Sequence, residues 1–119
     1  MDLEKLYDMA EKYNSFSCKP TGRKYKIDEV FDDEKSVRWN REEVERRNKL
    51  YEEEVKRLNT EKNKMFCEWV YSVKYYIMQE TKVKQKKADK IYEYLYREHH
   101  SYGLFNVINH LDDLLELFI

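Results

Sequence analysis

The stretch from Arg23 to Tyr102 contains neither glycine nor proline, the two residues that most strongly interrupt regular structure. Tight β-hairpins usually need Gly, Asn-Gly or Asp-Gly at positions of positive φ, and the stretch has no such dipeptide. A many-stranded antiparallel sheet therefore has few places to turn. The sequence predicts an all-α fold built on a long central helix, with shorter helices packed on its C-terminal half.

Length and charge limit the classes of protein that fit. A chain of 119 residues suits a single helical domain that buries roughly two thirds of its unfolded surface. Charged residues make up 39% of the chain, but the formal net charge is only −1. Overall charge therefore predicts neither a nucleic-acid-binding protein nor an acidic mimic of nucleic acid.

The sequence predicts a cytoplasmic protein. It has no apolar run long enough to span a membrane, and its N-terminus lacks the charge order and apolar segment of a signal peptide. Cys18 and Cys67 fit a reducing compartment better than a disulfide scaffold.

The expected domain, 1–119, divides into four parts. Residues 1–14 have helical spacing of apolar side chains, with Asp2 able to cap the helix. Residues 15–39 combine a loop with an acidic segment at 28–34, where a strand over 24–31 is an alternative. The last two parts are a long helix or helical hairpin at 40–80 and a two-helix region at 84–119.

The long helix is expected to begin at Asn40. Asn40 with Glu43 resembles a capping box, and Trp39 with Val44 fits the accompanying hydrophobic staple. Five glutamate-to-cation pairs spaced i,i+4 would support the helix in water. They are Glu42 with Arg46, Glu43 with Arg47, Glu45 with Lys49, Glu52 with Lys56 and Glu53 with Arg57.

A heptad-like stripe continues along this helix, interrupted by polar residues at Asn48 and Lys62. Because its register persists, we favour one helix over 41–80, roughly 60 Å long, which would protrude or dimerise. The alternative is an antiparallel hairpin with a turn at Asn59-Thr60, where Thr60 caps the second helix. In a coiled-coil-like homodimer the predicted seam is Val44, Tyr51, Val55 and Leu58.

The C-terminal half is expected to hold the core. Apolar residues surround a helix drawn through 65–78, which is typical of a helix buried on several sides, although a strand also fits the alternation there. The basic stretch 82–90 is a candidate connection. A further helix should end near Gly103, and the final helix should cover 104–118, with Phe118 in its apolar stripe.

No motif indicates an enzyme, a metal site or a cofactor. The chain has no glycine-rich phosphate loop, nucleophile elbow, His-Glu-x-x-His or Cys-x-x-Cys. Cys67 lies in an apolar run, where a thiol usually packs rather than reacts. His99, His100 and His110 are spaced for surface or helix-end roles rather than as ligands of one ion.

Two Lys-rich segments could contact nucleic-acid phosphates. One is 19–26. The other, 82–90, supplies Lys82, Lys84, Lys86, Lys87 and Lys90.

Tyrosine supplies the stronger indication of function, since the chain has eleven. Tyrosine buries a large area at interfaces and keeps a polar hydroxyl, although it can equally fill the domain's own core. The candidate partner-binding residues are Tyr71, Tyr75, Tyr92, Tyr94 and Tyr96.

The leading functional hypothesis is a non-catalytic protein-interaction module. Low Ala, Gly and Pro with high Lys, Glu and Tyr is also typical of small phage and mobile-element proteins, so an inhibitor of a host enzyme or defence complex is its specific form. The alternative is a nucleic-acid-binding accessory protein that uses the segments 19–26 and 82–90.

Overall fold

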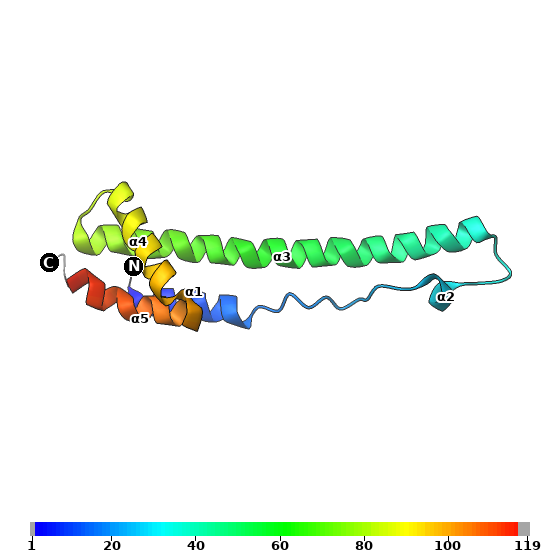
Figure 1. Cartoon of the computed structure of the whole chain (residues 1–119), viewed down its shortest axis with the longest axis horizontal. Helices are drawn as coiled ribbons and strands as arrows, with labels where there is room; N and C mark the ends of the chain where they lie inside the picture. The colour runs from blue at the N-terminus through cyan, green and yellow to red at the C-terminus, as the bar shows by residue number, and fades with distance from the viewer. Residues whose placement is uncertain (1, 117–119) are drawn as a thin grey trace. The chain divides into compact units, whose positions relative to one another are not determined.

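The computed structural model describes residues 2–116, and every regular element within that range is helical (Figure 1). The predicted all-α fold, with a long helix and shorter helices packed against it, is confirmed. The elements are α1 Leu3–Ser15, α2 Ile27–Val30, α3 Val37–Thr81, α4 Gln85–His99, the 3-10 turn η1 His100–Tyr102 and α5 Leu104–Leu115.

Helix α3 is continuous through the position where a hairpin turn was the alternative. The Thr60 hydroxyl donates to the Lys56 carbonyl oxygen at 2.8 Å, as a threonine inside a helix does. Thr60 is therefore an interior residue rather than a cap, and the prediction of one helix is correct.

The predicted start of α3 at Asn40 is wrong by one turn. Ser36 is the capping residue, because its hydroxyl accepts from the Trp39 backbone N–H at 3.0 Å. The Asn40 side chain is buried, and its amide bonds to the backbone of Asp32. Asn40 therefore does not cap the helix. Of the five predicted ion pairs, the one found in the described chain is Glu43 with Arg47, at 2.9 Å.

Helix α3 ends at Thr81, immediately before the basic stretch 82–90. Lys82 has a φ of 60°, and its N–H donates to the Met78 carbonyl oxygen at 3.0 Å, closing the last turn. The connection was predicted at 82–90, but α4 already begins at Gln85. The connection is therefore three residues long, and the rest of the stretch is helical.

Gly103 separates η1 from α5 with a φ of 93°, which confirms the predicted glycine at this helix end. Helix α5 follows the expected apolar stripe up to Leu115. The predicted position of Phe118 lies outside the described residues.

Contacts divide the chain into two compact units. Unit 1 comprises the residues up to Phe16 together with those from Asn63 onward, and unit 2 is Ser17–Lys62. Helix α3 contributes its second part to unit 1 and its first part to unit 2.

Unit 1 contains an apolar core built from α1, the second part of α3, α4 and α5. Aromatic rings connect three of these helices: Phe66 lies against Tyr13 and Tyr96, with centroids 5.8 Å apart in both pairs. The largest fully buried core side chains are Trp69, Leu6, Ile77, Leu95, Ile108 and Leu111. The apolar run 65–78 thus forms a core helix, as predicted, and not a strand.

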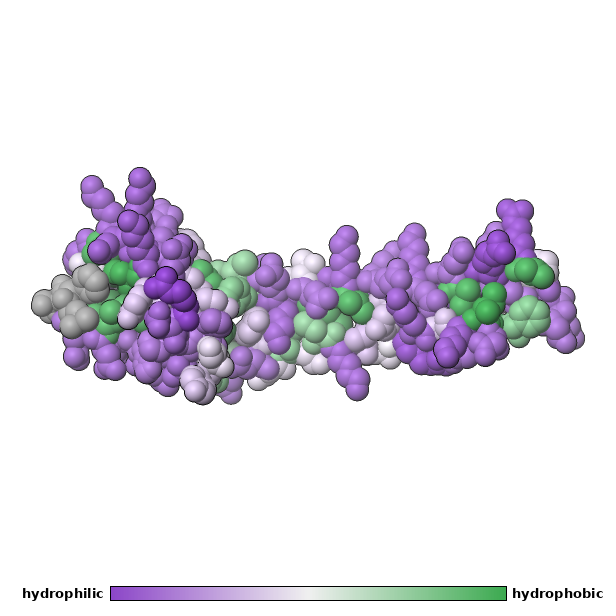
Figure 2. Space-filling view, in the orientation of Figure 1, coloured by the Kyte–Doolittle hydropathy of each residue, from purple (hydrophilic) through white to green (hydrophobic). Residues whose placement is uncertain are grey.

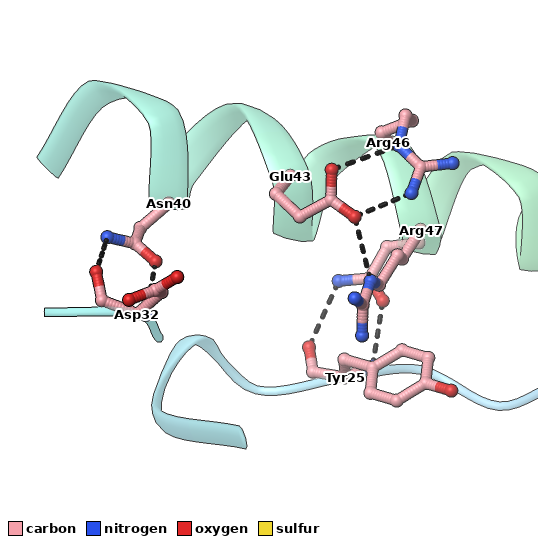
Figure 3. Close-up of polar contacts among 7 residues, drawn as sticks. Tyr25, Asp32, Asn40, Glu43, Arg46 and Arg47 are labelled. Carbon is pink, nitrogen blue, oxygen red and sulfur yellow. Dashed lines mark hydrogen bonds and ion pairs between the residues drawn. The ribbon is translucent and has the colours of Figure 1, made fainter. Parts of the chain in front are cut away.

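Unit 2 consists of the first part of α3 and the segment 17–36, which we call the strap. The strap runs beside α3 in the opposite chain direction (Figure 1). Two asparagine amides of α3 hold it. Asn48 accepts from the Tyr25 N–H at 2.8 Å and donates to the Tyr25 carbonyl oxygen at 3.1 Å. Asn40 makes the same pair of bonds to Asp32, at 2.7 and 3.0 Å (Figure 3).

Candidate interaction surfaces

The five candidate tyrosines fall into two groups. Tyr71, Tyr75 and Tyr94 are exposed, at 71%, 43% and 47%. Tyr92 is buried and Tyr96 half-buried, and their rings stack with centroids 5.8 Å apart. Burial raises the pKa of the Tyr92 hydroxyl far above its ordinary value. Tyr92 is therefore a core residue, and three of the five candidates are available to a partner.

Tyr71 lies on an open, mainly apolar groove of about 440 Å³ within unit 1. The side chains that line it come from α1 and α3: Lys5, Met9, Lys64, Cys67, Glu68, Tyr71 and Ser72. Tyr75 follows Tyr71 by one helical turn and therefore shares its side of α3.

Cys67 is exposed in this groove, and the expectation that it packs into the core is wrong. Consecutive helical positions point about 100° apart. Phe66 and Trp69 take the directions toward the core, so that Cys67 turns outward. The apolar run around Cys67 in the sequence does not show which of its residues face the core and which face outward.

A second apolar surface lies in unit 2 and was not predicted. Ile27, Phe31, Val37 and Trp39 are 48%, 52%, 66% and 39% exposed. The bonds between Asp32 and Asn40 hold this part of the strap against the start of α3. Figure 2 shows green apolar surface around α2 and the first turns of α3. Apolar residues placed between the acidic ones of 28–34 were the available sequence signal.

The predicted dimer seam faces the strap. All four seam residues are half-buried: Val44, Tyr51, Val55 and Leu58. Asn48 belongs to the same stripe, and its side-chain amide is bonded to the Tyr25 backbone. The Cys18 thiol also donates to the Leu58 carbonyl oxygen at 3.8 Å. Helix pairing along this stripe would require the strap to move away.

The two Lys-rich segments differ in their surroundings. In 19–26, Lys24 pairs with Glu52 at 3.5 Å and Arg23 with Glu29 at 2.6 Å, so carboxylates already neutralise part of its charge. In 82–90, the side chains of Lys82, Lys84, Lys86, Lys87 and Lys90 are all exposed. The structure assigns these two segments to different units.

The histidines do not assemble a metal centre. The His99 and His110 rings are in contact, with centroids 3.7 Å apart, while His100 stacks on Tyr96 and bonds to its carbonyl oxygen. In residues 2–116, His, Cys, Asp and Glu side chains form no group of three or more that could hold a metal ion.

No helix within the described range has both the length and the apolar character needed to cross a membrane. Comparisons of the chain with protein-family models, with curated proteins and with solved structures each gave no match.

Proposed function

We propose that this protein is a non-catalytic interaction module that binds another protein through the groove between α1 and α3. The binding residues on α3 are Tyr71 and Tyr75, with Met9 of α1 forming the apolar part of the opposite side. The specific form that composition favours is an inhibitor of a host enzyme or defence complex, encoded by a phage or mobile element.

The exposure of Tyr71 carries this proposal. Its side chain is 71% exposed beside a groove with an apolar lining, while the core of unit 1 is filled by other residues. A tyrosine that the core does not use has area to offer a partner at low conformational cost. Lys5, Lys64 and Glu68 supply charges of both signs at the groove, as the polar rim of an interface does.

Loss of both tyrosines tests the proposal. Partner capture from the native host should fail for the double variant Tyr71→Ala/Tyr75→Ala. Each substitution removes an aromatic anchor, and such an anchor contributes about 2 kcal/mol or more to the binding free energy at a hot spot. The matched control is Tyr102→Ala, which removes a tyrosine that is 86% exposed and does not line the groove. Equal capture by the double variant and the wild type would refute the groove as the binding site.

A second candidate function rests on the exposed lysines of 82–90. Five lysines in nine residues, on a connection and the first turns of α4, could neutralise nucleic-acid phosphates. Binding to duplex or single-stranded DNA should then weaken steeply with salt, and the slope should fall in the Lys84→Ala/Lys86→Ala/Lys87→Ala variant. Binding that is absent at low salt would eliminate this alternative.

A further inference from the structure

Unit 2 contains a pocket of about 390 Å³ whose lining includes three arginines. Arg23 comes from the strap, and Arg46 and Arg47 come from α3. Leu50, Tyr25 and Tyr51 supply apolar and aromatic surface to the same pocket. The two parts of unit 2 therefore bring together guanidinium groups that lie more than twenty residues apart in the sequence.

One carboxylate serves two of these arginines (Figure 3). Glu43 accepts from Arg46 Nε at 3.1 Å and Nη2 at 2.5 Å, and from Arg47 Nε at 2.9 Å. Hydrogen bonds from Arg46 and Arg47 lower the pKa of Glu43 to about 2. Glu43 is therefore a single carboxylate shared between two guanidinium groups.

The remaining arginine, Arg23, belongs to the strap and pairs with Glu29 at 2.6 Å. The Arg23 guanidinium lies 4.2 Å from the centroid of the Tyr25 ring, and that of Arg47 lies 5.3 Å from the same centroid. Tyr25 is fixed in turn by the Asn48 amide. Both guanidiniums thus lie against the same ring, which the amide bonds hold in place before any ligand arrives.

Within the described chain, these arginines have more N–H donors than their protein acceptors use. A guanidinium has five N–H donors in a planar fork that matches phosphate and carboxylate oxygens. Within the described chain Arg47 directs one of them, on Nε, to a protein acceptor. The one carboxylate that lines the pocket, Glu54, accepts from the backbone N–H and the hydroxyl of Thr21, and these bonds lower its pKa.

We propose that this pocket binds a phosphate monoester, with the phosphoryl oxygens on Arg23, Arg46 and Arg47 and the organic group against Tyr25, Tyr51 and Leu50. The phosphoryl oxygens accept from guanidinium N–H groups that Glu43 and Glu29 do not use. This site belongs to unit 2 and is independent of the partner-binding groove of unit 1.

Side-chain NMR of the arginines tests the site directly. In the full-length protein, phenyl phosphate should shift the Nε–Hε resonances of Arg46 and Arg47 in a saturable way. Inorganic phosphate should do the same but bind more weakly, because it lacks a ring to contact the two tyrosines. Arg47→Gln should weaken phenyl phosphate binding roughly tenfold or more, since a charge-assisted pair of hydrogen bonds is lost.

Two variants make the test specific. Arg41→Gln removes an exposed guanidinium from the same helix that does not line the pocket, and it should leave the affinity unchanged. Glu54→Gln keeps an acceptor for Thr21 but removes a negative charge, so it should strengthen binding severalfold. The proposal fails if the Arg46 and Arg47 resonances do not shift at millimolar phenyl phosphate, or if Arg41→Gln and Arg47→Gln weaken binding equally.

Discussion

Asn48 illustrates what a single residue contributes to unit 2. In the sequence it is a polar interruption of an apolar stripe, and in the structure its amide satisfies both backbone groups of Tyr25. A strand would make the same pair of bonds in a β-ladder. The sequence pattern could not reveal this role, because the partner is backbone and lies 23 positions away.

We expect Asn48→Ala to release the strap locally. Removing the amide leaves the partly buried N–H and carbonyl of Tyr25 without their partner, at a cost of about 1–2 kcal/mol. Hydrogen exchange at the Tyr25 amide should accelerate roughly tenfold. Lys49→Ala, at the exposed neighbouring position, is the matched control and should change little. Unchanged exchange in Asn48→Ala would contradict the role assigned to this amide.

Glu43 gives unit 2 a defined response to acid. The folded pKa of about 2 lies below the ordinary value of 4.5, so the unfolded chain takes up the proton first as the pH falls. The stabilisation from Glu43 is therefore complete above about pH 4.5 and disappears as the pH falls toward 2.

Carbon-13 NMR of the Glu43 carboxyl should show a titration midpoint near 2. In the variant Arg46→Gln/Arg47→Gln the midpoint should rise toward the ordinary value, because the two hydrogen-bonding cations that lower it are gone. An identical midpoint in both proteins would show that these arginines do not hold Glu43.

At the scale of elements, the sequence predicted α3 well and the strap poorly. The absence of breakers and the persistent apolar register indicated one helix, and Thr60 lies inside it as expected for continuity. The start was misplaced because Asn40 resembles a cap, whereas Ser36 does the capping. The strap has little periodicity of its own, and side chains of α3 determine its path.

Gly103 joins η1 to α5 with φ 93° and ψ 179°, a backbone region that is essentially restricted to glycine. A methyl group at this position meets nothing within 4 Å, so substitution strains the backbone alone. Gly103→Ala should cost about 1–3 kcal/mol of the free energy of unfolding, seen as a lower midpoint in thermal denaturation.

Gly22→Ala is the natural control for this substitution. Its added Cβ would lie 3.8 Å from a Glu54 carboxylate oxygen, an ordinary contact, and positive φ among the described glycines is confined to Gly103. We expect no loss of stability in Gly22→Ala. Equal destabilisation by the two substitutions would show that backbone conformation is not the cause.

At the scale of the whole molecule, composition and periodicity predicted the fold class and the packing of shorter helices on the C-terminal half of α3. They did not predict that the contacts form two units, because the strap uses side chain to backbone bonds that leave no pattern of apolar residues. The candidate tyrosines were identified as a group. Their division into core and surface depends on the helix faces, which only the packing of α3 against α4 decides.

Homodimer formation stays a prediction. The strap covers the predicted seam, so pairing through Val55 and Leu58 competes with the strap contacts of the same face. Sedimentation equilibrium at tens of micromolar should give twice the 14.8 kDa chain mass if copies pair. Val55→Asp/Leu58→Asp should then return it to the chain mass. A monomer in the wild type would refute the seam.

A partner protein bound in the proposed groove of unit 1 would contact Tyr71. The most direct test replaces Tyr71 with a photo-crosslinking amino acid in the native host, with the same replacement at Tyr102 as reference. We expect a discrete crosslinked species from position 71 that disappears when Met9→Glu places a charge in the groove. If position 71 gives no crosslink, or both positions give the same species, the groove is not the contact site.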